Sequence, residues 1–130
     1  MKKHVIEREI KAADQAINKK DFDTLMTFYT ADAALVVRPG LVANGRKEIR
    51  EAHQRISAYF NGSLEVSQGN MVVIEAGDTA LVLAKTYIKS PNKRDSEYSE
   101  ERSAVYVYRK DDGGKWLCAI DNSYGPELLE

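Results

Sequence analysis

The chain has 130 residues, of which 43% are hydrophobic and 30% charged, a composition typical of one globular domain rather than of a disordered chain. Nineteen Lys and Arg residues stand against 20 Asp and Glu residues, so a net charge of -1 offers no basic field for nucleic acid. The apolar stretches are far shorter than the roughly 20 residues of a membrane helix, and no apolar segment of a secretory signal follows the basic N-terminus. We therefore expect a single domain over residues 1–130 and a cytoplasmic protein, with neither nucleic acid nor membrane as a partner.

Cysteine and histidine are scarce in this chain. Cys118 is the single cysteine, and His4 and His53 are the two histidines, which excludes an internal disulfide and argues against a structural zinc site. The sequence also lacks a glycine-rich phosphate loop and a G-x-S-x-G elbow. We expect no metal, no cofactor and no hydrolysis by an activated serine, and we expect Cys118 to be a small buried hydrophobe.

The beginning of the chain has the apolar spacing of helices. Asp21 is suited to cap a short second helix that we expect to close at Tyr29. Before it, apolar residues four, three and four positions apart predict a first helix of about four turns, with one buried stripe made of Ile6, Ile10, Ala13 and Ile17.

A short strand and a third helix follow. Residues 33–38 predict the strand, which ends at Pro39 and Gly40 because proline cannot continue a strand ladder. Gly45 precedes the third helix, which we expect to end near Asn61 and Gly62 with a left-handed cap. The apolar stripe of this helix comprises Ile49, Ala52, His53, Ile56 and Phe60.

After Gly62 the apolar pattern changes to the alternation of β-strands. It predicts strands at residues 64–75, 79–89, 103–110 and 115–124, joined by turns at 77–78 and 111–114 and by a charged loop at Ser90–Glu97. Helices followed by consecutive strands predict an α+β domain in which the helices cover one face of an antiparallel sheet.

The strand expected at 79–89 is apolar on both faces, with Leu81 and Leu83 on one face and Val82 and Ala84 on the other. The helices can cover only one of these faces, so the other face needs a different cover. We therefore expect a homodimer formed through the outer face of the sheet.

Four segments, spread over nearly the whole chain, carry a resemblance to a known family. They are Ala16–Asp23, Phe28–Ala33, Gly45–Arg50, and Gly114–Trp116 leading to Asp121–Tyr124. In this order they resemble the nuclear transport factor 2-like superfamily, and within it the SnoaL-like and ketosteroid-isomerase-like branch. The resemblance implies a conical fold, in which three N-terminal helices pack into a strongly curved antiparallel sheet, with an apolar pocket at the wide end and a dimer across the sheet. It does not imply one reaction, because the superfamily includes isomerases, dehydratases, polyketide cyclases and non-catalytic binding modules.

The catalytic pattern of the steroid isomerases in this branch is not kept in this chain. By the resemblance, the tyrosine of their oxyanion hole falls on Ala13, the base on or beside Arg38, and the second aspartate near Ala104. A cation in place of the proton-abstracting carboxylate removes the base. We therefore do not expect ordinary ketosteroid isomerisation.

Two residues are candidates for proton transfer. His53 lies near the centre of the apolar stripe of the third helix, where it is either a proton carrier or a core histidine hydrogen-bonded to a carbonyl or a tyrosine. Asp14 lies on the shoulder of the first helix's stripe and faces either the pocket or solvent. If it faces the pocket, burial raises its pKa and suits it to acid or base catalysis.

Other polar and aromatic side chains are candidates for binding the substrate. On the last strand, Trp116 is expected to anchor the inner face, which turns Asn122 and Tyr124 inward and Asp121 outward, whereas a β-bulge exchanges the two sets. Tyr29 and Tyr59 are expected either to reach the pocket mouth with their hydroxyl groups, while the rings stay in the core, or simply to pack in the core or at the rim. Arg38, at the end of the short strand, either binds an anionic ligand at the rim or is solvated.

Two functions remain open at this stage. The first is a small-molecule-binding protein that acts without a cofactor as an isomerase, dehydratase or cyclase, moving a proton on an apolar compound with a carbonyl or hydroxyl group. The second is a non-catalytic ligand-binding or dimeric association module. An open cavity of about 300 Å³ or more, into which both His53 and Asp14 point, favours the enzyme.

Overall fold

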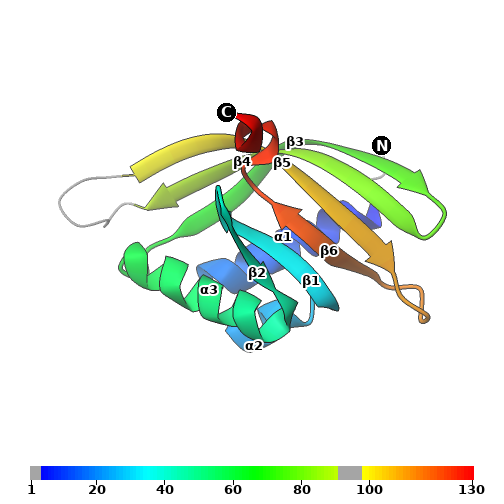
Figure 1. The fold of residues 1–130 in the computed structure, drawn as a ribbon, viewed down its shortest axis with the longest axis horizontal. Helices are drawn as coiled ribbons and strands as arrows, with labels where there is room; N and C mark the ends of the chain where they lie inside the picture. Colours follow the sequence, from blue (N-terminus) through cyan, green and yellow to red (C-terminus); the bar gives the residue numbers. More distant parts are fainter. Residues whose placement is uncertain (1–3, 91–97) are drawn as a thin grey trace.

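The computed structural model describes residues 4–90 and 98–130. The charged loop expected at Ser90–Glu97 therefore lies, from residue 91 onward, outside the described residues. Figure 1 shows the helices below an arched sheet. In chain order, the elements are α1 (Val5–Asn18), α2 (Phe22–Met26), β1 (Tyr29–Arg38), β2 (Leu41–Asn44), α3 (Gly45–Tyr59), β3 (Glu65–Ala76), β4 (Thr79–Ser90), β5 (Tyr98–Lys110), β6 (Trp116–Asn122) and a short 3-10 helix, η1 (Gly125–Leu129).

The sheet has six strands in the order β2-β1-β6-β5-β4-β3. Neighbouring strands run antiparallel except β1 and β6, which are parallel and place Leu35 beside Asp121. The sheet is curved and does not close into a barrel, and three α-helices accompany it (Figure 1). The predicted α+β class, with helices packed in a curved and mainly antiparallel sheet, is confirmed.

The helices form where the sequence predicts them. Ile6 and Ile10 are at most 4% exposed on the inner face of α1, which the predicted stripe requires. The Asp21 carboxylate accepts a hydrogen bond of 3.2 Å from the backbone N–H of Thr24 and so caps α2. After α3, Asn61 has a φ of 55° and Gly62 a φ of 71°, the left-handed backbone expected at this cap.

Three details differ from the sequence predictions. The helix α2 ends at Met26, and Tyr29 starts β1 instead of closing this helix. The backbone N–H of Cys118 on β6 donates to the carbonyl of Phe28 over 2.8 Å, so pairing with a distant strand extends this segment. The short strand β2 was not predicted, and β5 starts at Tyr98 rather than at residue 103.

The inner face of β4 packs onto the core. Val82 is fully buried there and Ala84 is 5% exposed, whereas Leu81 and Leu83 on the outer face are 38% and 42% exposed. The alternation predicted for this strand is therefore confirmed. No helix within residues 4–90 and 98–130 is long and apolar enough to cross a membrane.

Candidate functional site

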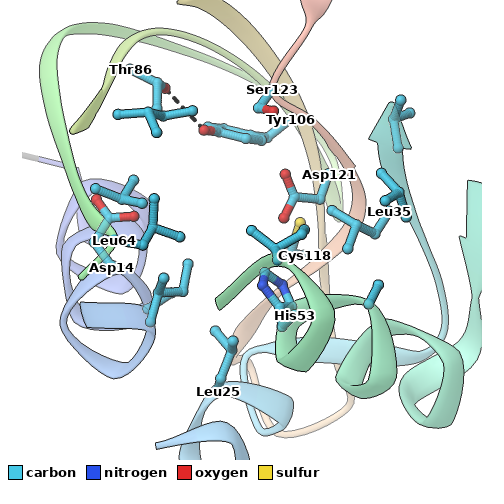
Figure 2. Close-up of a pocket in the computed structure, with 18 of the residues that line it drawn as sticks. Asp14, Leu25, Leu35, His53, Leu64, Thr86, Tyr106, Cys118, Asp121 and Ser123 are labelled. Atoms are coloured by element: carbon cyan, nitrogen blue, oxygen red, sulfur yellow. Dashed lines mark hydrogen bonds between the residues drawn. The ribbon is translucent and has the colours of Figure 1, made fainter. Parts of the chain in front are cut away.

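A cavity of about 630 Å³ lies between the helices and the concave face of the sheet. This volume falls within the range of about 300 to 1,000 Å³ that is usual for small-molecule sites. Its walls come from α1, α3 and the strands β1, β3, β4, β5 and β6, and Figure 2 shows part of this lining. Apolar side chains make up most of the wall, among them Ile10, Ala13, Ile17, Leu25, Leu35, Ala52, Ile56 and Leu64. The polar groups described below are exceptions to this apolar lining.

Asp14 lies on the α1 side of the cavity and is 8% exposed. It follows Ile6 and Ile10 at spacings of four, so the inner face of the helix carries it into the cavity wall. Burial raises the pKa of Asp14 to about 7; a hydrogen bond from Gln68 opposes this rise and the negative charge of Asp121 adds to it. Of the two orientations that the sequence allowed, the structure has the inward one, and Asp14 is suited to exchange a proton near neutral pH.

A chain of hydrogen bonds from the sheet ends at Asp14. The Gln68 amide nitrogen donates to Oδ2 of Asp14 over 3.0 Å, and the Thr86 hydroxyl donates to the Gln68 oxygen over 2.9 Å. Thr86 has one hydroxyl proton, so its oxygen accepts from the Tyr106 hydroxyl, which lies 3.1 Å away. Every bond in this chain points toward Asp14 and holds its carboxylate as an acceptor.

Asp121 lies on the β6 side, with its carboxyl group directed into the cavity (Figure 2). Burial raises the pKa of Asp121, and the hydrogen bond from Tyr29 opposes this rise. The cavity thus separates two acids, Asp14 and Asp121, whose negative charges repel one another across a largely apolar space. This repulsion favours a state in which one acid is protonated and the other ionised.

His53 and Tyr29 form a second chain of hydrogen bonds, which ends at Asp121. The Tyr29 hydroxyl donates to Oδ2 of Asp121 over 2.6 Å and lies 3.0 Å from Nε2 of His53. Because Tyr29 gives its one proton to Asp121, its oxygen accepts from His53, which places the imidazole proton on Nε2. Burial lowers the pKa of His53 to about 4, so the ring is neutral at neutral pH.

The structure therefore combines the two roles considered for His53, since the ring lines the cavity and also bonds to a tyrosine. Its neutral state changes the chemistry that it can perform. A neutral imidazole donates or accepts a hydrogen bond but does not supply a proton as a general acid. Asp14 rather than His53 titrates near pH 7 in this cavity.

A β-bulge decides which residues of β6 reach the cavity. Consecutive residues of β5, Val107 and Tyr108, pair with Ile120 and Cys118, so β6 has one extra residue between these two positions. The side-chain alternation along the strand shifts there. Cys118 before the bulge and Asp121 after it both line the cavity. Asp121 therefore faces the cavity and Asn122 does not, which is the outcome that the sequence analysis expected if a β-bulge interrupts the strand.

Trp116 and Asn122, expected to bind the substrate, are not among the residues that line the cavity, and this expectation is corrected. Trp116 is 5% exposed and packs beside His4, with ring centroids 6.4 Å apart. The Asn122 side-chain oxygen accepts from the backbone N–H groups of Tyr124 and Gly125, which closes the turn before η1. Asn122 is therefore a turn residue in this fold.

The other three candidates lie at the opening of the cavity. Arg38 and Tyr59 line it and are exposed, Tyr59 by 53%. The half-buried Tyr124 also lines it, and its hydroxyl donates to the carbonyl of Val37 over 3.3 Å. The sequence analysis considered Arg38 and Tyr59 for the rim and turned Tyr124 inward on the last strand, and all three line this cavity.

Several residues of the site were missed by the sequence analysis. One group is the hydrogen-bond chain of Gln68, Thr86 and Tyr106, of which only Gln68 contacts Asp14 directly. This chain exists only because strands β3, β4 and β5 pair with one another and β3 packs against α1. Arg55 and Arg102 also line the cavity and were not selected as candidates. The alternation of buried residues along β4 is a signal that could have found Thr86, which is 2% exposed on the inner face. In the part of the chain that the structure describes, no group of three or more His, Cys, Asp and Glu residues could hold a metal ion.

Comparison with solved structures finds the same fold in several proteins. Aln2 from a Streptomyces species is 15% identical, with 95% of this chain and 90% of that chain covered and a TM-score of 0.82. A Streptomyces avermitilis protein of the NTF2-like family, provisionally described as a dehydratase, is 23% identical, with 90% and 91% covered and a TM-score of 0.75. A Catenulispora acidiphila protein in complex with S-DNPA is 13% identical, with 89% and 87% covered and a TM-score of 0.73. At these identities the likeness establishes the fold alone.

A sequence comparison with curated proteins finds no match. A comparison with protein families matches residues 6–119 to the SnoaL-like domain. The match covers most of the chain and includes α1, α3 and most of the sheet. The chain belongs to the SnoaL-like family, and it shares its fold with proteins described as NTF2-like.

Proposed function

We propose that this protein binds a small, largely apolar molecule with a carbonyl or hydroxyl group and moves a proton on it without a cofactor, as an isomerase, dehydratase or cyclase. One observation carries the proposal: Asp14, an acid with a pKa of about 7, lines an apolar cavity of about 630 Å³ opposite a second acid, the half-buried Asp121. Solvated aspartates are ionised at pH 7, and a pKa near the working pH is what acid–base catalysis requires.

The two acids have complementary parts in this proposal. Asp14, ionised, removes a proton from the carbon next to the substrate carbonyl, and negative charge develops on the substrate oxygen. Asp121, protonated, donates a hydrogen bond to that oxygen, and the apolar walls strengthen this contact because little water screens it. Asp14 then returns the proton to another carbon or, in a dehydration, to the departing hydroxyl group.

Tyr29 and His53 act as positioning residues. The Tyr29 hydroxyl holds one oxygen of Asp121, and His53 fixes the orientation of that hydroxyl. The other Asp121 oxygen is left to the substrate. The cavity also meets the size condition stated above for an enzyme, with both His53 and Asp14 in its wall. The provisional description of the Streptomyces avermitilis protein as a dehydratase is consistent with proton-transfer chemistry on this fold.

The test is exchange of the α-protons of an apolar ketone, 1-tetralone, for deuterium in D₂O, followed by proton NMR. The protein is expected to accelerate this exchange, with a midpoint near pH 7, and Asp14→Asn to reduce the acceleration at least about tenfold. The matched control is Asp23→Asn, because Asp23 is exposed and lies outside the cavity. Binding of the ketone without any acceleration would leave a non-catalytic ligand-binding module as the function.

We further propose a homodimer through the outer face of the sheet. Apolar residues on this face form a row: Val72 and Ile74 of β3 are 54% and 52% exposed, and Leu81 and Leu83 of β4 and Ile120 of β6 are 38% to 44% exposed. The half-buried Val107 of β5 pairs with both Leu81 and Ile120 and so links β4 to β6. Light scattering is expected to give twice the 14.6 kDa of one chain, and Leu83→Lys to give one chain. A single-chain mass for the unmodified protein would refute this dimer.

A further inference from the structure

Two arginines that line the cavity, Arg38 and Arg55, are more exposed to solvent than its two acids. Asp14 is 8% exposed and Asp121 is half-buried, and burial raises the pKa of both and favours their uncharged forms. Arg38 and Arg55 line the same cavity and are exposed to solvent. A side chain that lines a cavity and also reaches solvent lies at its opening. The two acids thus favour neutral forms, and the opening carries positive charge.

The arginines at the opening are not neutralised by the part of the chain that the structure describes. Within residues 4–90 and 98–130, no carboxylate lies within ion-pair distance of Arg38 or Arg55. Other arginines in that part have a specific partner: Arg50 pairs with Asp23, Arg102 with Glu100 and Arg109 with Asp32. Arg38 and Arg55 therefore keep their charge and their donor groups available to a ligand.

A third arginine supports the same side of the opening from β5. The Arg102 guanidinium lies 4.2 Å from the centre of the Tyr124 ring, and its Nη1 donates to the Ser123 hydroxyl over 2.9 Å. Tyr124 and Ser123 line the cavity, so Arg102 holds this part of the wall in place. Its charge is partly balanced by Glu100, at 3.0 Å, whereas Arg38 and Arg55 have no such balance among the described residues.

We propose that the opening is an anion-binding site and that the ligand is an amphipathic organic acid. Its apolar body fills the cavity, its carbonyl or hydroxyl group meets Asp14 and Asp121, and its carboxylate lies at the opening between Arg38 and Arg55. This assignment rests on the proposed function, because it takes the cavity as the ligand site and adds the charge of the ligand. Guanidinium groups suit a carboxylate because their paired N–H donors match its two oxygens.

The test compares 2-naphthylacetate with its methyl ester by isothermal titration calorimetry, in about 20 mM and 500 mM NaCl. The two probes share one apolar body and differ in charge. The carboxylate is expected to bind more tightly at low salt, and this advantage shrinks at high salt because ions screen exposed charges. The double variant Arg38→Gln/Arg55→Gln is expected to weaken carboxylate binding about tenfold and ester binding less than about twofold.

The control variant is Arg50→Gln, on the same helix as Arg55 but outside the cavity, and it is expected to change neither affinity. Equal loss of both probes in the double variant would show that the arginines shape the cavity rather than bind an anion, and would overturn the inference. If the ester binds and the double variant leaves the carboxylate affinity unchanged, the inference is also overturned, whereas the proposed function stays in place. If neither probe binds at millimolar concentration, both this inference and the proposed function are refuted.

Discussion

The Tyr29 hydroxyl lies 2.6 Å from Oδ2 of Asp121, although the two residues are 92 positions apart in the chain. The parallel pairing of β1 with β6 makes this contact possible, since it sets Tyr29 beside Cys118, three residues before Asp121 on the same strand. The same hydroxyl lies 3.0 Å from His53 on α3. Tyr29 therefore joins three separate elements of the fold at one wall of the cavity.

Removing this hydroxyl has a predictable cost. Tyr29→Phe leaves the half-buried Asp121 without the hydrogen bond that lowers its pKa, and we expect the free energy of unfolding at pH 7 to fall by about 1 to 3 kcal/mol. Urea denaturation measures this change. The control is Tyr87→Phe on the outer side of β4, expected to change stability by less than about 0.5 kcal/mol. Equal effects of the two variants would contradict a special role for the Tyr29 hydroxyl.

The pKa values of Asp14 and His53 make opposite contributions to the dependence of stability on pH. The pKa of Asp14 is raised from 3.8 to about 7, so between these values only the folded state holds its proton, and stability falls as pH rises. The pKa of His53 is lowered from 6.5 to about 4, so between these values only the unfolded state holds its proton, and stability rises with pH. Between about pH 4 and 6.5 the two contributions oppose one another.

Two variants separate these contributions. Relative to the unmodified protein, Asp14→Asn is expected to increase the slope of unfolding free energy against pH over this window, and His53→Gln to decrease it. Each change approaches about 1.4 kcal/mol per pH unit, the value for one proton. Urea unfolding at several pH values between 4 and 7 measures the slopes. Parallel curves for all three proteins would mean that neither pKa is shifted by folding.

Gln68 is expected to control the protonation of Asp14. Its amide donates to the Asp14 carboxylate and so lowers a pKa that burial raises. Gln68→Leu removes this bond, and the pKa of Asp14 is expected to rise further above its present value of about 7. Carbon-13 NMR titration of the labelled aspartate carboxyl groups measures this. The control is Gln54→Leu at an exposed position of α3, and a pKa that moves equally in both variants, or falls in Gln68→Leu, contradicts the prediction.

Asn122 is expected to affect stability without affecting ligand binding. Its side-chain oxygen accepts two backbone N–H groups at 3.1 and 3.0 Å, and its side chain lies outside the cavity lining. Asn122→Ala should lower the free energy of unfolding by about 1 to 2 kcal/mol. Calorimetry should give the same 1-tetralone affinity as for the unmodified protein. A loss of affinity at unchanged stability would restore Asn122 as a ligand-binding residue.

The position of Asp14 illustrates how far local periodicity reaches. Asp14 follows Ile6 and Ile10 at helical spacing, so the sequence alone places it on or beside the buried face of α1. The sequence does not show what the carboxylate meets there. Gln68 reaches it from a strand 54 positions away, and that pairing exists only after β3 packs against α1.

The last strand shows where periodicity fails. A strict alternation from Trp116 turns Asn122 inward and Asp121 outward, and the structure has Asp121 in the cavity wall instead. The cause is one extra residue between Cys118 and Ile120, accommodated because β6 pairs with β5 on one side and β1 on the other. A bulge of this kind depends on the neighbouring strands, so the pattern of one strand cannot locate it.

The sequence alone was enough to predict the helix positions, the inward faces of α1 and α3, and the two-sided apolar pattern of β4. Each of these features depends on residues that are only a few positions apart. Only the tertiary structure decided that Tyr29 starts a strand, that Asp121 rather than Asn122 faces the cavity, and that His53 is neutral while Asp14 titrates near pH 7. Strand pairing, burial and the shift of a pKa all depend on groups that are distant in sequence, and those groups meet only in the folded chain.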